Sequence, residues 1–458
     1  MSELKLKRHN RRTFLKYAGT SALALSLGSL ANGPWVHAQG PILIGMANPL
    51  STFFGEAAEK AMRLGISEIN AAGGMLGRPV DLIVSDSAGR ADQALLAVQD
   101  LAARGAQFLT GIFFSEELLG AIPAFPIVRK IFLGTGASTP AATIQVNNDY
   151  NNFKFFFRVN PINSILILQA VVIFIRGFLE AGLKWNSLVV FAEDAAWNKT
   201  ITDGLPRILA SVGSKITVVD TIRYAEDTTD FTSLYTRAEN AMRGKTGGIF
   251  TVMAHTGTRP TAQWAAQRVA LPYVGINVQA QDGRFDELTQ GAAESVVTLT
   301  TGAKAPITEK TIPFVEAFES FDFKREIKSP SYNAYGSYDA LYMLKEAVEA
   351  AGVLPNNEAN TDLIIQQLEK FGALGADGKP TNLFVGTGGQ LGFYEKGEQV
   401  PSIAPFLPQG VPPIIPHDVR FAPNLAYGLW IQYQGGEQKV IFPPNLATAN
   451  FVLPPWLR

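Results

Sequence analysis

Short apolar runs alternate with amphipathic segments along most of this chain. The first repeat of the pattern has an apolar run at 42–46, a helical pattern over 56–70 and a second apolar run at 79–84. Such a strand–helix–strand unit is almost always a right-handed crossover between parallel strands. The loop after the first strand therefore lies at the strand's carboxyl end, where open α/β sheets bind ligands. This loop contains Ser51 and Phe53, which we take as candidate ligand contacts.

The same alternation continues in two series. The pattern predicts strands at 107–110, 127–133 and 153–159, with helices at 90–104, from 115 and from 140. After a long apolar helix at 162–183, it predicts strands at 187–191, 215–220, 248–253, 272–276 and 294–300, with helices at 197–211, 230–243 and after 260. Helices at 309–321, 332–351 and 361–371 follow. Two such series predict an α/β fold with two doubly wound parallel-sheet lobes.

The last part of the chain has a different character. Residues 401–423 are rich in proline, which argues against regular structure there. Apolar runs at 426–433 and 438–442 flank Gly435 and Gly436, a pattern typical of a β-hairpin.

The amino terminus has the features of an export signal. Several Lys and Arg residues precede an apolar and small-residue stretch at 17–31, and a small-x-small cleavage site ends at Ala38. Arg11 and Arg12, followed by Thr-Phe-Leu-Lys, resemble a twin-arginine signal. An ordinary secretory leader that happens to contain two arginines is the alternative. Either interpretation predicts that residues 1–38 are a signal peptide and that the protein is periplasmic.

Composition narrows the function classes. Hydrophobic residues make up 47% of the chain and charged residues 17%, which is typical of a packed globular protein. A net charge of -1 gives no electrostatic footprint for nucleic acid. The chain has no cysteine, which excludes disulfides, thiol catalysis and a lipid-anchored cysteine, so we expect a soluble exported form. The apolar stretch at 165–175 is too short to span a membrane and is expected to be a buried helix.

Catalytic and cofactor motifs are weak or missing in the sequence. It contains no Gly-x-Ser-x-Gly elbow and no His-Glu-x-x-His motif. The glycines of 134–136 do not form a dinucleotide fingerprint after the first strand. Only His255 and His417 lie beyond the predicted signal peptide, so a histidine metal cluster is not expected. The sequence therefore predicts a protein that is not an enzyme and has no cofactor or metal.

Several motifs, in their order and spacing, resemble the type I periplasmic binding proteins, close to the leucine/isoleucine/valine-binding branch. They are Ile44-Gly45 with Ser51, Asn70 to Gly74, Gly77 to Val80, Asp86, Gly134 to Pro140, Phe157-Arg158 and Tyr335 to Ala340. The resemblance covers about residues 41–397. It implies two lobes joined by a three-segment hinge, with a small solute trapped between them and passed to an ABC permease.

The resemblance also implies a division of the chain into lobes. Residues 41–157 with 302–386 would form the first lobe. Residues 158–301 with 387–458, including the proline-rich insert 401–423, would form the second. The crossovers are expected near Arg158, Ala303 and Gly386.

The family's binding residues map onto several positions of this chain. Ser115 falls where the family has a serine that binds the ligand carboxylate, and Gly136, Ala137 and Ser138 fall where the head group is held. The resemblance further assigns Trp197 as a second-lobe aromatic, His255 as part of a ligand-contacting loop, and Asp282, or else Asp194, as the acid that pairs a ligand ammonium. Phe113 comes from the same loop as Ser115 and is a further candidate.

Each candidate also has a purely structural interpretation. Ser115, Ser138 and Thr139 can be helix caps, since serine and threonine are common there. The phenylalanines and Trp197 can be core residues, and Asp282 can be a solvated loop acid.

We expect an extracytoplasmic solute-binding protein of an ABC importer, acting as a monomer on a small apolar amino acid or a related carboxylate or amide. The alternatives are a ligand-sensing subunit of a signalling receptor and an exported α/β hydrolase.

Replacing both arginines by lysine, Arg11→Lys with Arg12→Lys, tests the export prediction. The double variant should stay in the cytoplasm, because the twin-arginine pathway reads the arginine pair. Cell fractionation and immunoblotting measure this, with Lys5→Arg as a matched control that keeps the leader's charge. Unimpaired secretion of the unaltered protein in a strain without that pathway would contradict the prediction.

Overall fold

The computed structural model describes residues 40–407, 412–422 and 424–458. The predicted signal peptide, its arginine pair and its cleavage site lie outside the described residues. In the described part of the chain, none of the helices combines the length and the apolar character needed to cross a membrane.

The first sheet has five parallel strands in the order β2-β1-β3-β4-β5. They are β1 (Ile42–Asn48), β2 (Val80–Asp86), β3 (Phe108–Gly111), β4 (Phe132–Gly134) and β5 (Phe156–Arg158). Ile44 of β1 pairs with Leu82 on one side and with Phe108 on the other. The strand order therefore reverses beside β1, and the loops after β1 and β3 flank the resulting crevice.

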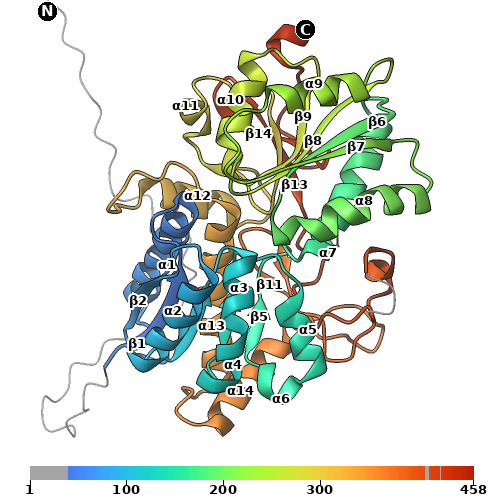
Figure 1. The fold of residues 1–458 in the computed structure, drawn as a ribbon. Helices are drawn as coiled ribbons and strands as arrows, with labels where there is room; N and C mark the ends of the chain where they lie inside the picture. The colour runs from blue at the N-terminus through green and yellow to red at the C-terminus, as the bar shows by residue number, and fades with distance from the viewer. Residues whose placement is uncertain (1–39, 408–411, 423) are drawn as a thin grey trace, which may run out of the picture. The chain divides into compact units, whose positions relative to one another are not determined.

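Helices cover both faces of the first sheet. The core on one face includes α1 (Phe53–Ala71), α13 (Tyr332–Ala351) and α14 (Glu358–Lys370), with α12 (Thr311–Ser320) packed outside α1. The core on the other face includes α2 (Ala91–Ala103), α3 (Ser115–Ala121), α4 (Phe125–Val128) and α5 (Ala141–Asn148). Figure 1 shows these helices around the strands.

The second sheet has four parallel strands in the order β7-β6-β8-β9. They are β6 (Ser187–Glu193), β7 (Thr217–Tyr224), β8 (Gly247–Met253) and β9 (Tyr273–Asn277). One face is covered by α7 (Ser164–Phe174), which continues as a π-helix at Ile175–Glu180, and by α8 (Lys199–Ser211). The other face is covered by α9 (Thr232–Ala241) and α10 (Thr258–Ala266). The expected pair of doubly wound parallel sheets is confirmed.

The predicted hairpin near the carboxyl terminus is also confirmed. Strands β13 (Leu429–Gln434) and β14 (Glu437–Phe442) meet at Gly435 and Gly436, which have φ of 62° and 80°. Two left-handed residues in a row are what a tight hairpin turn requires, and glycine adopts them without strain. Strand β10 (Val297–Thr300), expected as the last strand of the second parallel series, instead pairs antiparallel with β13.

The remaining elements are short. They are α6 (Tyr150–Phe153), α11 (Phe285–Leu288), β11 (Phe384–Val385), β12 (Gln390–Leu391) and 3-10 turns at Ile122–Ala124, Ala196–Asn198, Val278–Gln281, Pro401–Phe406 and Pro455–Leu457.

Two local predictions in the first lobe are wrong. The strand expected at 127–133 is helical at its start, because Pro126 lies in the first turn of α4, where proline is favoured, and Ile127 is 71% exposed. The strand forms only after Arg129, which takes a left-handed conformation that ends the helix. Thr139 is not the cap of α5 either, since Pro140 occupies that position and the helix begins at Ala141.

The chain after residue 387 contributes to the cores of both sheets. Leu391, Phe393, Val419 and Ala426 pack in the cluster that includes β1 and α13, although the sequence assigned this region to the second lobe. Trp430 and Phe442 pack with α7 on the second sheet. Figure 1 shows this orange-to-red part of the chain reaching β5 at one end and β8 at the other.

A fully buried ion pair holds this returning segment in place. Arg158, at the end of β5, donates through Nη1 to Oδ1 of Asp418 at 2.7 Å, and neither side chain is exposed. Asn163, the residue that caps α7, donates to the other oxygen of Asp418 at 2.7 Å. The second guanidinium nitrogen of Arg158 donates to the carbonyl of Thr139. One carboxylate thus connects β5, the start of α7 and the loop after β4.

The Asp418→Ala variant should lose about 3–5 kcal/mol of unfolding free energy, because it leaves the Arg158 guanidinium buried without its counter-charge. Urea unfolding followed by circular dichroism measures the change. The matched control is Asp203→Ala, whose partner is Arg223 and whose own side chain is 72% exposed. The control should lose at most about 1 kcal/mol, and equal losses in both variants would contradict the role given to the buried pair.

Candidate ligand-binding site

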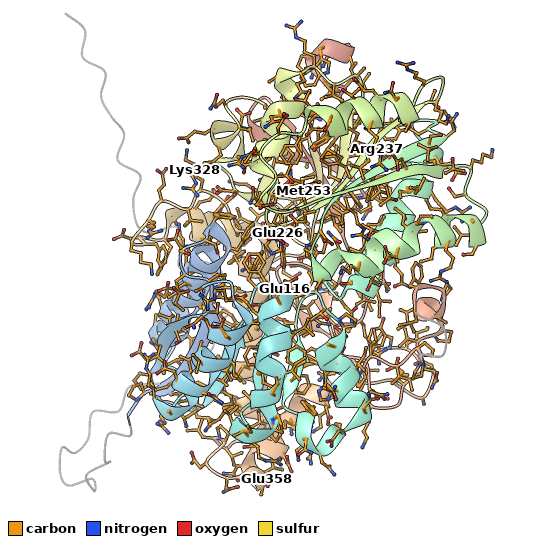
Figure 2. All side chains as sticks on the ribbon, in the orientation of Figure 1. Glu116, Glu226, Arg237, Met253, Lys328 and Glu358 are labelled. Carbon is orange, nitrogen blue, oxygen red and sulfur yellow. The ribbon has the colours of Figure 1, made fainter. Side chains whose placement is uncertain are left out.

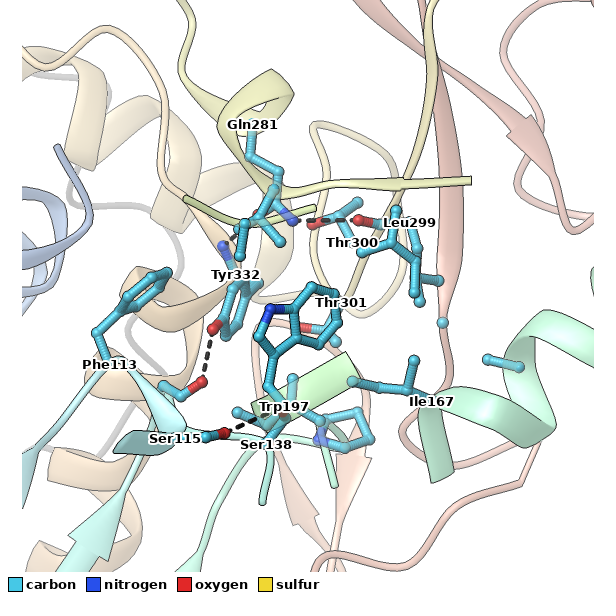
Figure 3. A pocket seen from close by; sticks show the side chains of 18 of the residues that line it. Phe113, Ser115, Ser138, Ile167, Trp197, Gln281, Leu299, Thr300, Thr301 and Tyr332 are labelled. Carbon is cyan, nitrogen blue, oxygen red and sulfur yellow. Dashed lines mark hydrogen bonds between the residues drawn. The ribbon is translucent and has the colours of Figure 1, made fainter. Parts of the chain in front are cut away.

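An apolar cavity lies where loops from the two parallel sheets meet (Figure 3). The space between its walls, including some that is open to solvent, is about 650 Å³. The first sheet contributes residues of the loops after β3 and β4, and the second sheet contributes residues of the loops after β6, β8 and β9. Both sets lie at the carboxyl ends of parallel strands, the edge that the sequence pattern predicted.

The walls are mostly aromatic and aliphatic. Phe113 stacks on Phe54 with ring centroids 4.2 Å apart, and Tyr332 lies beside Phe113 at 5.7 Å. The indole of Trp197 and the side chain of Ile167 line the cavity from the second sheet's elements. Such walls favour an apolar ligand, because burying its surface is the main gain on binding.

A buried glutamate organises the first sheet's loops. The Glu117 carboxylate on α3 accepts hydrogen bonds from the backbone N–H groups of Phe113 at 3.1 Å and Phe114 at 2.8 Å, and from the hydroxyl of Ser87. It therefore fixes the backbone that carries the Phe113 ring. Burial raises the pKa of Glu117, although these three donors act in the opposite direction.

A second buried glutamate has the same role on the second sheet. Glu193, at the end of β6, accepts from Trp197 Nε1 at 2.9 Å, from the N–H of Ala254 at 2.7 Å and from that of His255 at 2.9 Å. The His255 ring nitrogen Nδ1 lies 2.8 Å from the same carboxylate, and Thr256 donates through both its N–H and its hydroxyl. One carboxylate thus orients the Trp197 ring and the loop after β8.

These contacts shift two pKa values. Burial acts to raise the pKa of Glu193, but the hydrogen bonds from His255, Trp197 and Ala254 outweigh it, so the pKa lies below its usual value. Burial acts to lower the pKa of His255, but the adjacent Glu193 carboxylate, assisted by Glu226 and Glu116, raises it. Figure 2 labels Glu116 and Glu226 near these loops. His255 and Glu193 are therefore expected to be a charged pair below neutral pH.

The two candidate serines lie together in the cavity wall. The hydroxyl oxygens of Ser115 and Ser138 are 3.4 Å apart, and both residues are buried. Ser115 is the first residue of α3 rather than its cap, a position taken by Phe114. Its hydroxyl instead accepts from the N–H of Thr139 at 3.0 Å. The capping interpretation of Ser115 is wrong, and its hydroxyl connects the two loops that form this end of the cavity.

The other candidates divide between this cavity and an adjoining one. Phe113, Gly136 and Trp197 line the main cavity. Phe53, His255 and Asp282 line the adjoining cavity, and Phe114 and Ala254 lie in the wall between the two. Ser51, which is exposed, and Ala137, which packs in the core under β3 and β4, are not among the residues lining either cavity.

Neither acid proposed for a ligand ammonium is free in the main cavity. Asp282 accepts from Arg284, with Nη2 at 2.8 Å from Oδ2 and Nε at 3.2 Å from Oδ1. Asp194 is exposed to solvent. The structure thus gives Asp282 an arginine partner in the adjoining cavity.

Sequence reasoning missed several lining residues. Gln281, Thr301 and Tyr332 lie in the main cavity wall, and Phe54 stacks behind Phe113. Tyr332 is the first residue of a predicted helix, and Gln281 directly precedes the candidate Asp282. Both positions could therefore have been predicted as ligand contacts from the sequence. Thr301 follows a strand whose antiparallel pairing was not expected.

Comparison with known proteins identifies the family. The family model described as periplasmic binding protein matches residues 41–391, and this chain belongs to that family. Its members are substrate-binding proteins, and the resemblance found in the sequence is confirmed.

Individual relatives are distant. Leu/Ile/Val-binding protein homolog 1 of Brucella abortus is 23% identical over 317 residues, which cover 68% of this chain and 79% of the relative. A putative branched-chain amino acid ABC transporter from Silicibacter pomeroyi superposes with a TM-score of 0.69 at 16% identity, covering 91% of this chain and 100% of that one. The substrate-binding protein LivJ from Streptococcus pneumoniae, in complex with isoleucine, gives 0.66 at 16% identity, over 88% and 100%. These solved structures share the fold.

The His255→Gln variant tests the charged pair through the pH dependence of stability. Because the pKa of His255 is raised in the folded state, its stabilisation is complete below about pH 6.5, the usual pKa, and is lost as pH rises through the folded pKa. The difference in unfolding free energy between wild type and His255→Gln should therefore be largest near pH 6 and shrink towards pH 9. Denaturant titrations at four pH values measure it. A difference that stays constant would show that His255 is neutral in the folded protein.

Proposed function

We propose that this protein is the extracytoplasmic solute-binding component of an ABC importer and captures a small apolar amino acid or a related carboxylate or amide. The observation that carries the proposal is the apolar cavity with its two adjacent hydroxyls, lined by loops at the carboxyl ends of both parallel sheets. Ligand contacts from both sheets let a solute stabilise one arrangement of two lobes over another.

The relatives support this proposal. Brucella relatives carry the name Leu/Ile/Val-binding protein homolog, and solved neighbours were crystallised with isoleucine and with leucine. By analogy, the partner is the membrane permease of an ABC transporter, and the protein acts in the periplasm as a monomer. The three crossovers near Arg158, Ala303 and Gly386 are part of the same proposal.

The site favours binding over hydrolysis. A serine nucleophile needs a base within hydrogen-bond reach, and in the described residues Ser115 contacts only Ser138 and the N–H of Thr139. Two groups that could act as a base are engaged elsewhere, His255 by Glu193 and Glu117 by Ser87 and two backbone N–H groups. A sensing role for a signalling receptor uses the same binding step and differs only in the membrane partner.

A thermal-shift screen followed by small-angle scattering tests the proposal. Apolar amino acids, carboxylates and amides are screened against the protein without residues 1–38, and a true ligand at a hundred times its dissociation constant should add about 2.7 kcal/mol of stability. The radius of gyration should then fall with saturating ligand.

The Trp197→Ala variant is the binding-deficient control, because its indole forms one wall of the cavity. It should show neither the thermal shift nor the compaction. A ligand that stabilises the variant as strongly as the wild type binds elsewhere, and a fully unchanged radius at saturation would contradict lobe closure. Uptake of the ligand by cells with and without this protein separates transport from sensing.

A further inference from the structure

The cavity has no ionised side chain in its wall. Its polar side chains are Ser115, Ser138, Gln281, Thr300 and Thr301, and among the described lining residues none is Asp, Glu, Lys or Arg. An amino acid zwitterion brings an ammonium group, and burying that charge without a partner costs several kcal/mol. Because the wall has no carboxylate, it disfavours a ligand that carries an ammonium group.

Three acids close to the cavity are already occupied by the protein, and Glu116, which accepts from the N–H of Ala196 and has a buried Oε2 without a partner among the described residues, is not among the residues lining it. Glu117 accepts from Ser87 and two backbone N–H groups, and Glu193 accepts from Trp197, His255, Thr256 and Ala254. Asp282 is held by Arg284. Recruiting any of them to a ligand ammonium would break bonds that position the cavity walls.

Three backbone carbonyls at the serine end of the cavity accept hydrogen bonds from within the protein. The carbonyl of Gly136 accepts from the Tyr332 hydroxyl at 2.5 Å, and that of Ser138 accepts from the N–H and the hydroxyl of Ser164 at 2.8 and 3.0 Å. The carbonyl of Thr135 accepts from Asn160 at 2.7 Å. Three of the four carbonyls of residues 135–138 thus already accept a hydrogen bond, and that of Ala137, a residue that does not line the cavity, accepts none from the described residues.

The N–H groups of the same loop are free. Those of Gly136, Ala137 and Ser138 form no hydrogen bond with any residue that the structure describes. The hydroxyls of Ser115 and Ser138 add two rotatable donors beside them. Hydrogen bonds from several neutral donors suit a carboxylate, which accepts on both oxygens, better than they suit an amide with its own N–H donors.

The hydroxyl of Thr301 is a further polar group in the cavity wall. The hydroxyl of Thr301 is buried, lines the cavity and has no hydrogen-bond partner among the described residues, and Figure 3 labels it with the other lining side chains. A buried hydroxyl without a hydrogen-bond partner destabilises the protein. A neutral oxygen on the ligand would supply the missing partner.

We infer that the cavity selects an apolar monocarboxylate without an ammonium group, such as a 2-oxo acid with a branched aliphatic or aromatic chain. This inference rests on the proposed binding function and narrows its ligand class. The carboxylate meets the donors of the Gly136–Ser138 loop and the two serines, the apolar chain lies against Phe113 and Trp197, and the oxo group meets Thr301.

Isothermal titration calorimetry with ligands matched in carbon skeleton tests the inference. The four probes are 4-methyl-2-oxopentanoate, 4-methylpentanoate, L-leucine and 4-methylpentanamide, and the series of phenylpyruvate, 3-phenylpropanoate and L-phenylalanine provides a second skeleton. Each acid without an ammonium should bind at least about tenfold more tightly than the amino acid of the same skeleton. The amide should bind more weakly than 4-methylpentanoate.

Two variants make the test specific to named groups. Thr301→Val keeps the side chain's shape, and it should weaken the 2-oxo acid about tenfold while leaving 4-methylpentanoate unchanged. Gln281→Glu places a carboxylate in the wall, and it should reverse the preference towards L-leucine. The wild-type amide of Gln281 accepts from the N–H of Tyr332 at 2.9 Å, a bond that glutamate can keep, and donates to the carbonyl of Leu299 at 3.1 Å, a bond that glutamate loses.

Tighter binding of L-leucine or L-phenylalanine by the wild type would overturn the inference and leave the proposed function standing. Binding of none of the probes at 1 mM would also overturn it. The proposed function would fail separately, if the wider screen found no solute that binds and changes the radius of gyration. Stronger binding of the amide than of the matched acid would reject the carboxylate assignment.

Discussion

The buried pairing of Arg158 with Asp418 is the interaction on which the arrangement of this chain depends. It joins the end of the first sheet, the capped start of α7 and a segment some 260 residues further along the chain. Burying two charges is costly, and close pairing with further hydrogen bonds offsets the cost. Both oxygens of Asp418 are paired, with Arg158 and Asn163, and Arg158 also donates to the carbonyl of Thr139, while its Nε has no hydrogen-bond partner among the described residues. The loop that carries Ser138 is therefore fixed by a contact from the far end of the sequence.

Two further buried carboxylates set up the cavity in the same way. Glu117 accepts hydrogen bonds from the backbone N–H groups of Phe113 and Phe114. Glu193 accepts hydrogen bonds from the loop after β8 and from the Trp197 indole. Both acids form their hydrogen bonds with backbone N–H groups and side chains of the protein itself. The consequence is a wall that is rigid yet uncharged. A ligand whose only charged group is negative can bind against that wall while Glu117 and Glu193 keep their hydrogen bonds to the two loops.

Aromatic contacts complete the link between the two sheets' loops. Phe54 stacks on Phe113, Phe113 meets Phe114 edge to face, and Phe114 stacks on the His255 ring with centroids 4.5 Å apart. Because the adjacent Glu193 carboxylate raises the pKa of His255, the imidazole at this contact is more readily protonated than an unperturbed histidine. The contact borders the adjoining cavity, which both Phe114 and His255 line.

The sequence by itself determined the two parallel arrays, the hairpin at Gly435 and Gly436, the family, and the strand-end loops that carry Ser115, Ser138 and Trp197. Those features follow from local periodicity and from turn residues with special conformations, which nearby residues decide. Only the tertiary structure decided that β10 pairs with β13, that Asp282 belongs to Arg284, and that Tyr332, Gln281 and Thr301 meet in one cavity. The β10–β13 pairing joins residues about 130 positions apart, the three lining residues come from positions 281 to 332, and Asp282 had several possible partners. Which of these residues contact one another depends on which charged groups and hydroxyls remain unpaired in the folded protein. A local sequence pattern does not contain that information.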